Sequence, residues 1–122
     1  MTEEATTTVT AEDVGESLRR ISIQGRLDAI GIDEVSRDLA EFASAPMKGV
    51  VVDLTQVPFL ASAGIGHLIS TAQAVKARGG FMTLLAMRGS SVMTSLEMVG
   101  IAPIIPVFDN PSAAYTSALR GW

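Results

Sequence analysis

The sequence predicts an α/β fold, a mostly parallel central sheet with helices, in the order β-β-α-β-α-β-α-β-α. Short apolar runs typical of buried strands alternate along the chain with segments whose apolar residues recur at spacings of three and four. Gly, Pro or a helix-capping residue stands at most of the junctions. Strand–helix alternation of this kind joins parallel strands through helical crossovers. The 122 residues fit one domain, which we expect over residues 6–122 after a flexible tail at 1–5.

The first third of the chain indicates a hairpin followed by a helix. β-branched residues at 6–10 and alternating apolar residues at 18–25 predict two strands, joined by turn residues at 13–16. Asp28 is a favourable N-cap for a helix that we expect to end near Ser44. The buried face of that helix is predicted from apolar residues at helical spacing: Ile32, Val35, Leu39 and Phe42.

The middle of the chain predicts two further strands with a helix between them. A nearly continuous apolar run at 49–55 is typical of a strand that is buried on both faces. We expect a helix to begin near Ser62 and to end at Gly79, where glycine favours termination. The apolar run at 81–87 predicts the next strand.

The last third of the chain predicts helix, strand and helix. Either serine at 90–91 is suited to cap the first of these helices. We expect the last strand at 104–108, and Pro106 within it argues for an edge position. The Asn-Pro pair at 110–111 is typical of a helix start. Trp122 is expected to pack against that final helix.

Composition excludes several kinds of active site. The chain has no cysteine, which rules out disulfides, iron–sulfur clusters, Cys-based zinc sites and thiol nucleophiles. His67 is the single histidine, so a His-rich metal site is excluded and any Ser-His-Asp arrangement would have to use it. A position at the surface or rim is the plainer prediction for this residue. We therefore expect no catalytic residue, no metal and no cofactor, and a protein that is not an enzyme.

Charge and hydropathy bear on partners and location. The formal net charge is −4 and the basic residues are scattered, which argues against nucleic acid as a partner. No segment approaches the roughly 18–20 apolar residues that span a bilayer, so we expect no membrane insertion. The acidic, polar N-terminus is not typical of a signal peptide, which favours a cytoplasmic protein.

One segment, residues 53–66, stands out as a candidate site. A buried strand is predicted to end near its start, and a short loop then brings Ser62 to the beginning of a helix. Sites in open α/β sheets gather beyond the carboxyl ends of parallel strands. The small neighbours Ala61, Ala63 and Gly64 leave the Ser62 hydroxyl accessible to a large partner. From the residues alone, a second interpretation stays open: Ser62 caps the helix and its small neighbours only permit close packing.

The chain resembles the STAS domain family, in particular the bacterial anti-sigma-factor antagonists, over about residues 6–119. The resemblance includes the segments 25–28, 50–55 and 100–109. Its most specific part is the family pattern D-L-[ST]-x-V-x-[FY]-[IL]-D-S-[SA]-G-[LI]-G, which aligns without a gap with residues 53–66. Gly64 matches the glycine of that pattern, and Asp53 matches the Asp at the end of the buried strand.

The resemblance implies a phosphorylation switch at Ser62. In that family a serine kinase that is also the anti-sigma factor modifies this serine, and a serine phosphatase reverses the modification. Only the unphosphorylated antagonist binds the anti-sigma factor, which then releases its sigma factor and so changes transcription. Ala61 stands where the family has an acidic residue, and Ala63 leaves Ser62 as the only acceptor in the loop.

The expected partner surface is the Ser62 loop with its flanking residues, in a monomer or weak dimer. Two alternatives stay open. Ala61 favours a scaffold subunit of a stress-sensing or lipid-transport complex that is not phosphorylated, and the G-x-G spacing favours a small-molecule or nucleotide binder. The residues expected to contact a partner are Asp28, Asp53, Leu60, Ala61, Ser62, Ala63, Gly64, Ile65, Gly66 and His67.

Overall fold

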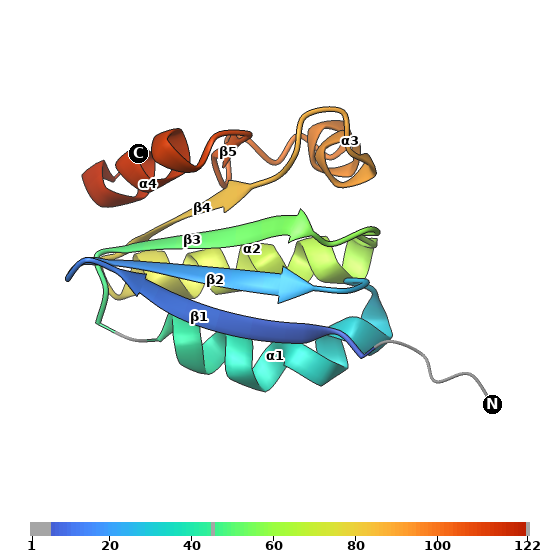
Figure 1. The fold of residues 1–122 in the computed structure, drawn as a ribbon, viewed down its shortest axis with the longest axis horizontal. Coiled ribbons are helices and arrows are strands. Elements are labelled where there is room, and N and C mark those ends of the chain that lie inside the picture. The colour runs from blue at the N-terminus through green and yellow to red at the C-terminus, as the bar shows by residue number, and fades with distance from the viewer. Residues whose placement is uncertain (1–5, 45, 122) are drawn as a thin grey trace.

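Five strands form one sheet in which each strand lies beside the one that precedes it in the chain (Figure 1). The computed structural model describes residues 6–44 and 46–121, so the expected tail at 1–5 and the packing of Trp122 lie outside the described residues. The predicted α/β order is confirmed. The strands are β1 (Thr8–Val14), β2 (Leu18–Gln24), β3 (Gly49–Gln56), β4 (Phe81–Leu85) and β5 (Val107–Phe108). The helices are α1 (Ala29–Ala43), α2 (Ser62–Ala77), α3 (Ser91–Met98) and α4 (Pro111–Arg120).

The predicted hairpin is present, but its first strand is longer and lies later than expected. β1 pairs with β2 in antiparallel register from Thr8 opposite Gln24 to Val14 opposite Leu18. The turn uses Gly15 at a φ of 74°, a left-handed conformation that glycine adopts at little cost. The expected strand at 6–10 was misplaced because this edge strand is largely exposed and polar, so backbone pairing rather than an apolar pattern determines its extent.

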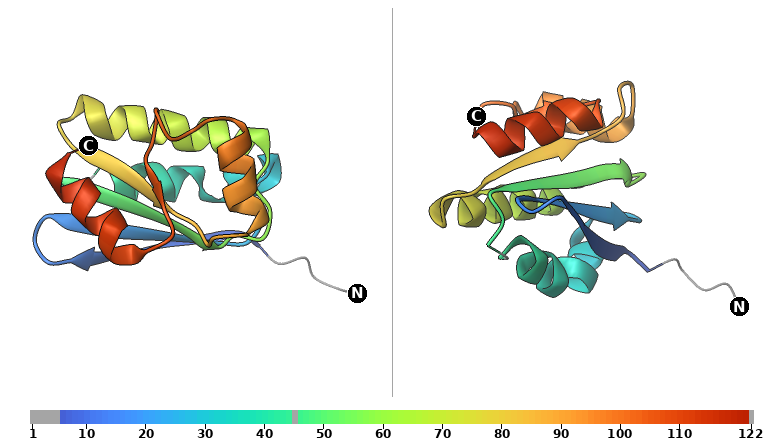
Figure 2. Two further views of the ribbon diagram at one scale, coloured as in Figure 1. Left: turned by 90° about the horizontal axis from the view of Figure 1, so that it is seen from above. Right: turned by 60° about the vertical axis from the view of Figure 1, so that its left-hand side comes forward.

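Two layers of helices enclose the sheet. α1 and α2 cover one face and α4 covers the other, as the ribbon shows from three directions (Figures 1 and 2). The larger core lies on the α1 and α2 face, and α3 contributes Val92 and Leu96 to it. The smaller core lies under α4, where Leu18, Val51 and Leu85 pack against its alanines. β3 is buried along nearly its whole length, as its apolar run predicted.

The last strand is shorter than the predicted 104–108. The amides of Ile104 and Ile105 both donate to the carbonyl of Ile101 at 2.8 Å, which closes a turn after α3. Pro106 has no amide hydrogen to donate, so only Val107–Phe108 pairs with β4. The edge position that Pro106 suggested is confirmed, because β5 ends the sheet.

The helix that carries the candidate site begins at the carboxyl end of β3, and the starts of α1 and α3 lie at the same end of the sheet (Figure 1). Asp28 caps α1 and Ser90 caps α3, each through a side-chain oxygen that accepts a backbone amide, as predicted. In the part of the chain that the structure describes, no helix has the length and hydropathy to cross a membrane.

Candidate functional site

The loop that leads into α2 is held against the segment that leads into α1. The Leu27 amide donates to the carbonyl of Phe59 at 2.9 Å, and the Ala61 amide donates to the carbonyl of Leu27 at 3.1 Å. This parallel bridge between Leu27 and Leu60 continues the pairing of β2 and β3 beyond the strand ends. The two helix starts therefore share one rigid edge.

Gly64 allows α2 to approach this bridge closely. A Cβ at that position would lie 2.4 Å from the carbonyl oxygen of Leu27 and 2.9 Å from Cδ1 of Leu60. By contrast, a Cβ at Gly66 would meet nothing within 4 Å. The G-x-G spacing is thus explained at its first glycine by backbone packing against Leu27.

Ser62 is the first residue of α2 and its side chain is exposed. The interpretation that it caps the helix is wrong, because the N-cap is Ala61, in an extended conformation and without a side-chain cap bond. Ala63 and Gly66 beside it are exposed as well. Within the described residues, no hydrogen bond engages the Ser62 hydroxyl, so a partner or a modifying enzyme can reach it.

The remaining predicted residues of this loop divide into a buried layer and a rim. Leu60, Gly64 and Ile65 are buried and support the loop from below. Ala61 and His67 are half-buried. A partner that covers Ser62 would therefore contact the exposed and half-buried residues of the loop, while the buried residues determine the conformation of the loop.

Asp28 lies beside this loop and is well ordered by its contacts. One carboxylate oxygen accepts the Gly31 amide at 2.9 Å, and the other accepts from Arg26 Nε at 3.2 Å. The hydrogen bond from Gly31, with a smaller contribution from Arg26, holds the pKa of Asp28 below its ordinary value. Asp28 therefore stays ionised at the edge that carries Ser62.

Asp53, one of the predicted partner contacts, is engaged in a hydrogen-bond network within the fold. Its side chain is 5% exposed and lies on the α4 face, where it forms an ion pair with Arg20. It also accepts the hydroxyl and the amide of Thr55 at 2.6 Å and 2.8 Å, and Arg20 in turn donates to the hydroxyl of Tyr115 at 2.8 Å. Burial raises the pKa of Asp53, but the hydrogen bonds from Thr55 and Arg20 together lower it below its ordinary value. Asp53 thus joins β2, β3 and α4.

Exposed apolar side chains from segments at the same end of the sheet as Ser62 were not among the predicted contacts. Phe59 is 42% exposed, and the Arg26 guanidinium lies over its ring with Cζ 4.6 Å from the centroid. Ile30 in the first turn of α1 and Met87 after β4 are 71% and 58% exposed. We call Arg26, Ile30, Phe59, Ser62 and Met87 the Ser62 surface. No signal in the sequence pointed to this exposure, because Phe59 and Leu60 are both apolar and the bridge decides which of them is buried.

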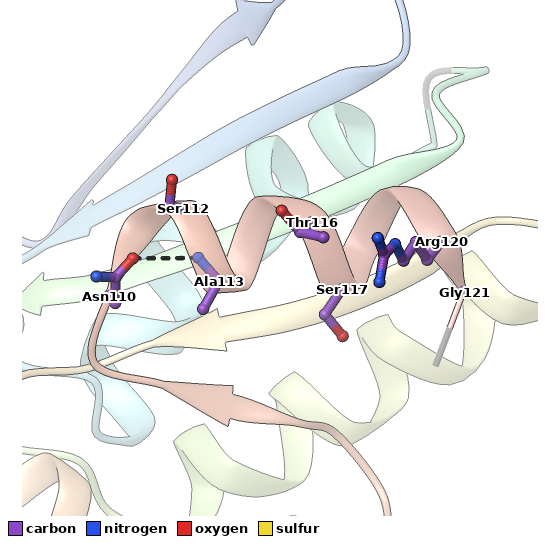
Figure 3. Close-up of a pocket in the computed structure, with 7 residues that line it drawn as sticks. All are labelled: Asn110, Ser112, Ala113, Thr116, Ser117, Arg120 and Gly121. Carbon is purple, nitrogen blue, oxygen red and sulfur yellow. Dashed lines mark hydrogen bonds between the residues drawn. The ribbon is translucent and has the colours of Figure 1, made fainter.

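Two other hollows are lined mainly by small or polar side chains, and in the first of them His67 Nε2 is buried without a hydrogen-bond partner among the described residues. A groove between α1 and α2 contains His67 among small residues such as Ala40 and Ala74. The outer face of α4 is a shallow polar surface, on which Asn110 accepts the Ala113 amide at 3.1 Å as a helix cap (Figure 3). Among residues 6–44 and 46–121, no group of three or more His, Asp or Glu side chains is placed to hold a metal ion.

The missing cap of α2 yields a prediction for Ala61→Asp. Ala61 already has the extended backbone of an N-cap residue. An aspartate there can accept a hydrogen bond from a backbone amide of the first turn, and its negative charge interacts favourably with the positive end of the helix dipole. We expect the free energy of unfolding to rise by about 1 kcal/mol, measured by urea denaturation. Ala61→Val, which offers no acceptor, is the control. Equal effects of the two substitutions would contradict the capping explanation.

The family model described as STAS domain matches residues 8–114, and the chain therefore belongs to the STAS domain family. The resemblance identified from the sequence is thereby confirmed. A search of curated protein sequences finds no match.

Solved structures share the fold at low sequence identity. An anti-sigma factor antagonist from Mycobacterium paratuberculosis is similar with a TM-score of 0.82 and 18% identity, over 93% of this chain and 94% of that one. An anti-sigma-factor antagonist (STAS) domain protein from Planctomyces limnophilus has a TM-score of 0.69 and 22% identity, over 95% and 99% of the two chains. The phosphorylated form of the Bacillus cell fate determinant SpoIIAA has a TM-score of 0.62 and 18% identity, over 87% and 96%.

Proposed function

We propose that this chain is an anti-sigma-factor antagonist, a binding protein rather than an enzyme, that acts in the cytoplasm through the Ser62 surface. Its partner is an anti-sigma factor that is also a serine kinase, and a serine phosphatase restores the binding form. The observation that carries this proposal is the exposed Ser62 hydroxyl at the start of α2, which no described residue engages, at the same end of the sheet as exposed apolar side chains. Exposed apolar side chains grouped on one surface are typical of protein–protein contacts.

Phosphorylation of Ser62 would act on the interface more than on the fold. The phosphate adds about −1.5 to −2 charges and three strong acceptor oxygens. At the first position of α2 it lies near unpaired amides and the positive helix end, which accommodate an anion. A docked partner, however, would have to exclude water from that charge. A hundredfold loss of affinity requires only about 2.7 kcal/mol.

Binding to the anti-sigma factor tests this proposal directly. We expect phosphoserine at position 62 to weaken binding at least 100-fold in calorimetry, and Ser62→Ala to stay close to the unmodified protein. Ser70→Asp, which adds a charge at another exposed serine of α2, is the matched control and should change affinity little. Incubation with the kinase and ATP should add one phosphate to the intact mass, and none to Ser62→Ala. Equal affinity of the phosphorylated and unmodified proteins would refute the switch.

Ala61 supports a second candidate, a scaffold subunit of a stress-sensing or lipid-transport complex that is not phosphorylated. No carboxylate precedes Ser62, although the family pattern has one there. In that case a partner binds constitutively through the same surface. Stable co-purification of a partner, together with no labelling of Ser62 by the kinase, would favour the scaffold.

A further inference from the structure

Arg26 is a cation on the Ser62 surface, and some of its side-chain donors make no hydrogen bond to the described residues. Its side chain is 62% exposed. Only Nε is engaged by an acceptor among the described residues, at 3.2 Å from the Asp28 carboxylate. The guanidinium carbon lies 4.6 Å from the centroid of the Phe59 ring, and no acceptor among the described residues engages the two terminal nitrogens. A planar, two-pronged donor of this kind matches the geometry of a phosphate.

The bridge between the two lead-in segments sets the neighbours of Ser62. Arg26 contacts Phe59, and the bridge pairs Leu27 with Leu60. In the sequence Asp28 directly follows Leu27, and Ala61 and Ser62 directly follow Leu60. Side chains that alternate with the buried pair of the bridge face away from the core. Ala61 has no charge, so Arg26 and Asp28 are the charged residues that directly flank this bridge.

Two further charged residues follow the neighbouring strands at the same end of the sheet. Arg88, after β4, forms an ion pair with Asp109 at 2.9 Å, and Asp109 directly follows β5. Neither belongs to the segments that the bridge places beside Ser62. They supply a matched comparison, because Arg88 is an exposed arginine that is also paired with an aspartate.

We propose that Arg26 is the intramolecular partner of phosphorylated Ser62, and that its terminal nitrogens donate hydrogen bonds to the phosphate oxygens. This inference rests on the proposed function, and it names how this chain holds the modified state. Dianionic phosphate is a stronger acceptor than the carboxylate of Asp28, so the guanidinium is shared with or transferred to it. The cation favours the fully ionised phosphate, which delivers the full charge change at neutral pH.

Phosphorus NMR tests this pairing without any kinase. Phosphoserine is introduced at position 62 during translation, and the second ionisation of the phosphate is followed by its chemical shift between pH 4 and 9. We expect Arg26→Gln to raise the second phosphate pKa by about half a unit, a small shift because the site is exposed. Arg26→Lys should keep most of the lowering, since it retains the charge. Arg88→Gln should shift the pKa by less than half as much, and Ala61→Asp should raise it by adding a neighbouring anion.

The outcomes separate this inference from the proposed function. An unchanged phosphate titration in Arg26→Gln, or an equal shift in Arg88→Gln, would overturn the pairing. If phosphorylation still blocks the anti-sigma factor in that case, the proposed function stands without it. If the phosphate titration depends on Arg26 but phosphorylation leaves partner affinity unchanged, the pairing of Arg26 with phosphorylated Ser62 is supported and the proposed phosphorylation switch is refuted. Amide proton–nitrogen spectra of each variant show that the fold is retained.

Discussion

Gly64→Ala is expected to lower the free energy of unfolding by about 2 to 3 kcal/mol, the upper range for forcing extra volume into a packed site. The added Cβ would lie 2.4 Å from the Leu27 carbonyl, and a backbone atom cannot rotate away as a side chain can. α2 must therefore move off the bridge, which weakens the hydrogen bond from the Ala61 amide to Leu27. In thermal unfolding we expect a decrease of roughly 10 °C in Tm for a domain of this size.

Gly66→Ala is the matched control for that substitution. It lies on the same helix two residues further on, and its new Cβ would meet nothing within 4 Å. Replacing a helical glycine by alanine then raises stability by about 0.5–1 kcal/mol. Opposite signs for two identical substitutions would locate the effect in the contact with Leu27. A stable Gly64→Ala variant, with Tm equal to or above that of the unmodified chain, would contradict it.

Asp53→Ala is expected to destabilise the protein by about 3 kcal/mol, the lower end for breaking a buried ion pair by removing one partner. The carboxylate is 5% exposed and its loss leaves Arg20 and Thr55 without their acceptor. Arg20 is itself 29% exposed, so water relieves part of the cost. α4 should loosen as well, because Arg20 also donates to the Tyr115 hydroxyl at 2.8 Å.

Urea denaturation of two variants checks the Asp53 prediction. Asp13→Ala removes the partner of Arg19 in an exposed pair, whose aspartate side chain is 45% exposed, and should change the midpoint only slightly. Equal losses for Asp13→Ala and Asp53→Ala would show that burial of the pair contributes nothing. Hydrogen exchange should place the loosening caused by Asp53→Ala in α4.

The lowered pKa of Asp53 also predicts a pH dependence of stability. A carboxyl whose pKa is lower in the folded state adds stability in full above its ordinary pKa of about 3.9, and loses it as the pH falls through the folded value. The difference in unfolding free energy between the unmodified protein and Asp53→Asn should therefore be constant from pH 7 to 5. It should shrink below about pH 4. A difference that grows on acidification would contradict the prediction that folding lowers the pKa of Asp53.

The fold could be predicted because local patterns and topology agree. The continuous apolar run of β3 and the helical spacing of α1 each indicate one structure, and both are borne out. Asp28 as a cap of α1 and Pro106 at the sheet edge rest on backbone chemistry that is readable within a few residues. The exposure of Ser62 at a helix start follows from the same local rules.

Contacts between distant segments could not be predicted. Asp53 was predicted as a partner contact, and its network could not be foreseen, because alternation within β3 directs it to the α4 face and its ion pair with Arg20 spans 33 positions of the chain. The shortened β5 depends on Ile101, whose carbonyl accepts the two amides that a longer strand would need. Phe59 was missed because its exposure depends on the bridge that buries its neighbour Leu60.

The sheet order has a consequence for how the chain folds. Since every strand pairs with its predecessor, the sheet can grow by one strand at a time as the chain lengthens, and no early strand waits for a late one to be inserted beside it. Only the hairpin of β1 and β2 pairs locally; each later pairing is parallel and must wait for the helical crossover between its two strands, which slows its formation. The smaller core is completed last: Leu18, Val51 and Leu85 stay uncovered until α4 docks. A nascent chain that stalls before residue 111 would therefore present an apolar sheet face to chaperones or to other unfinished chains.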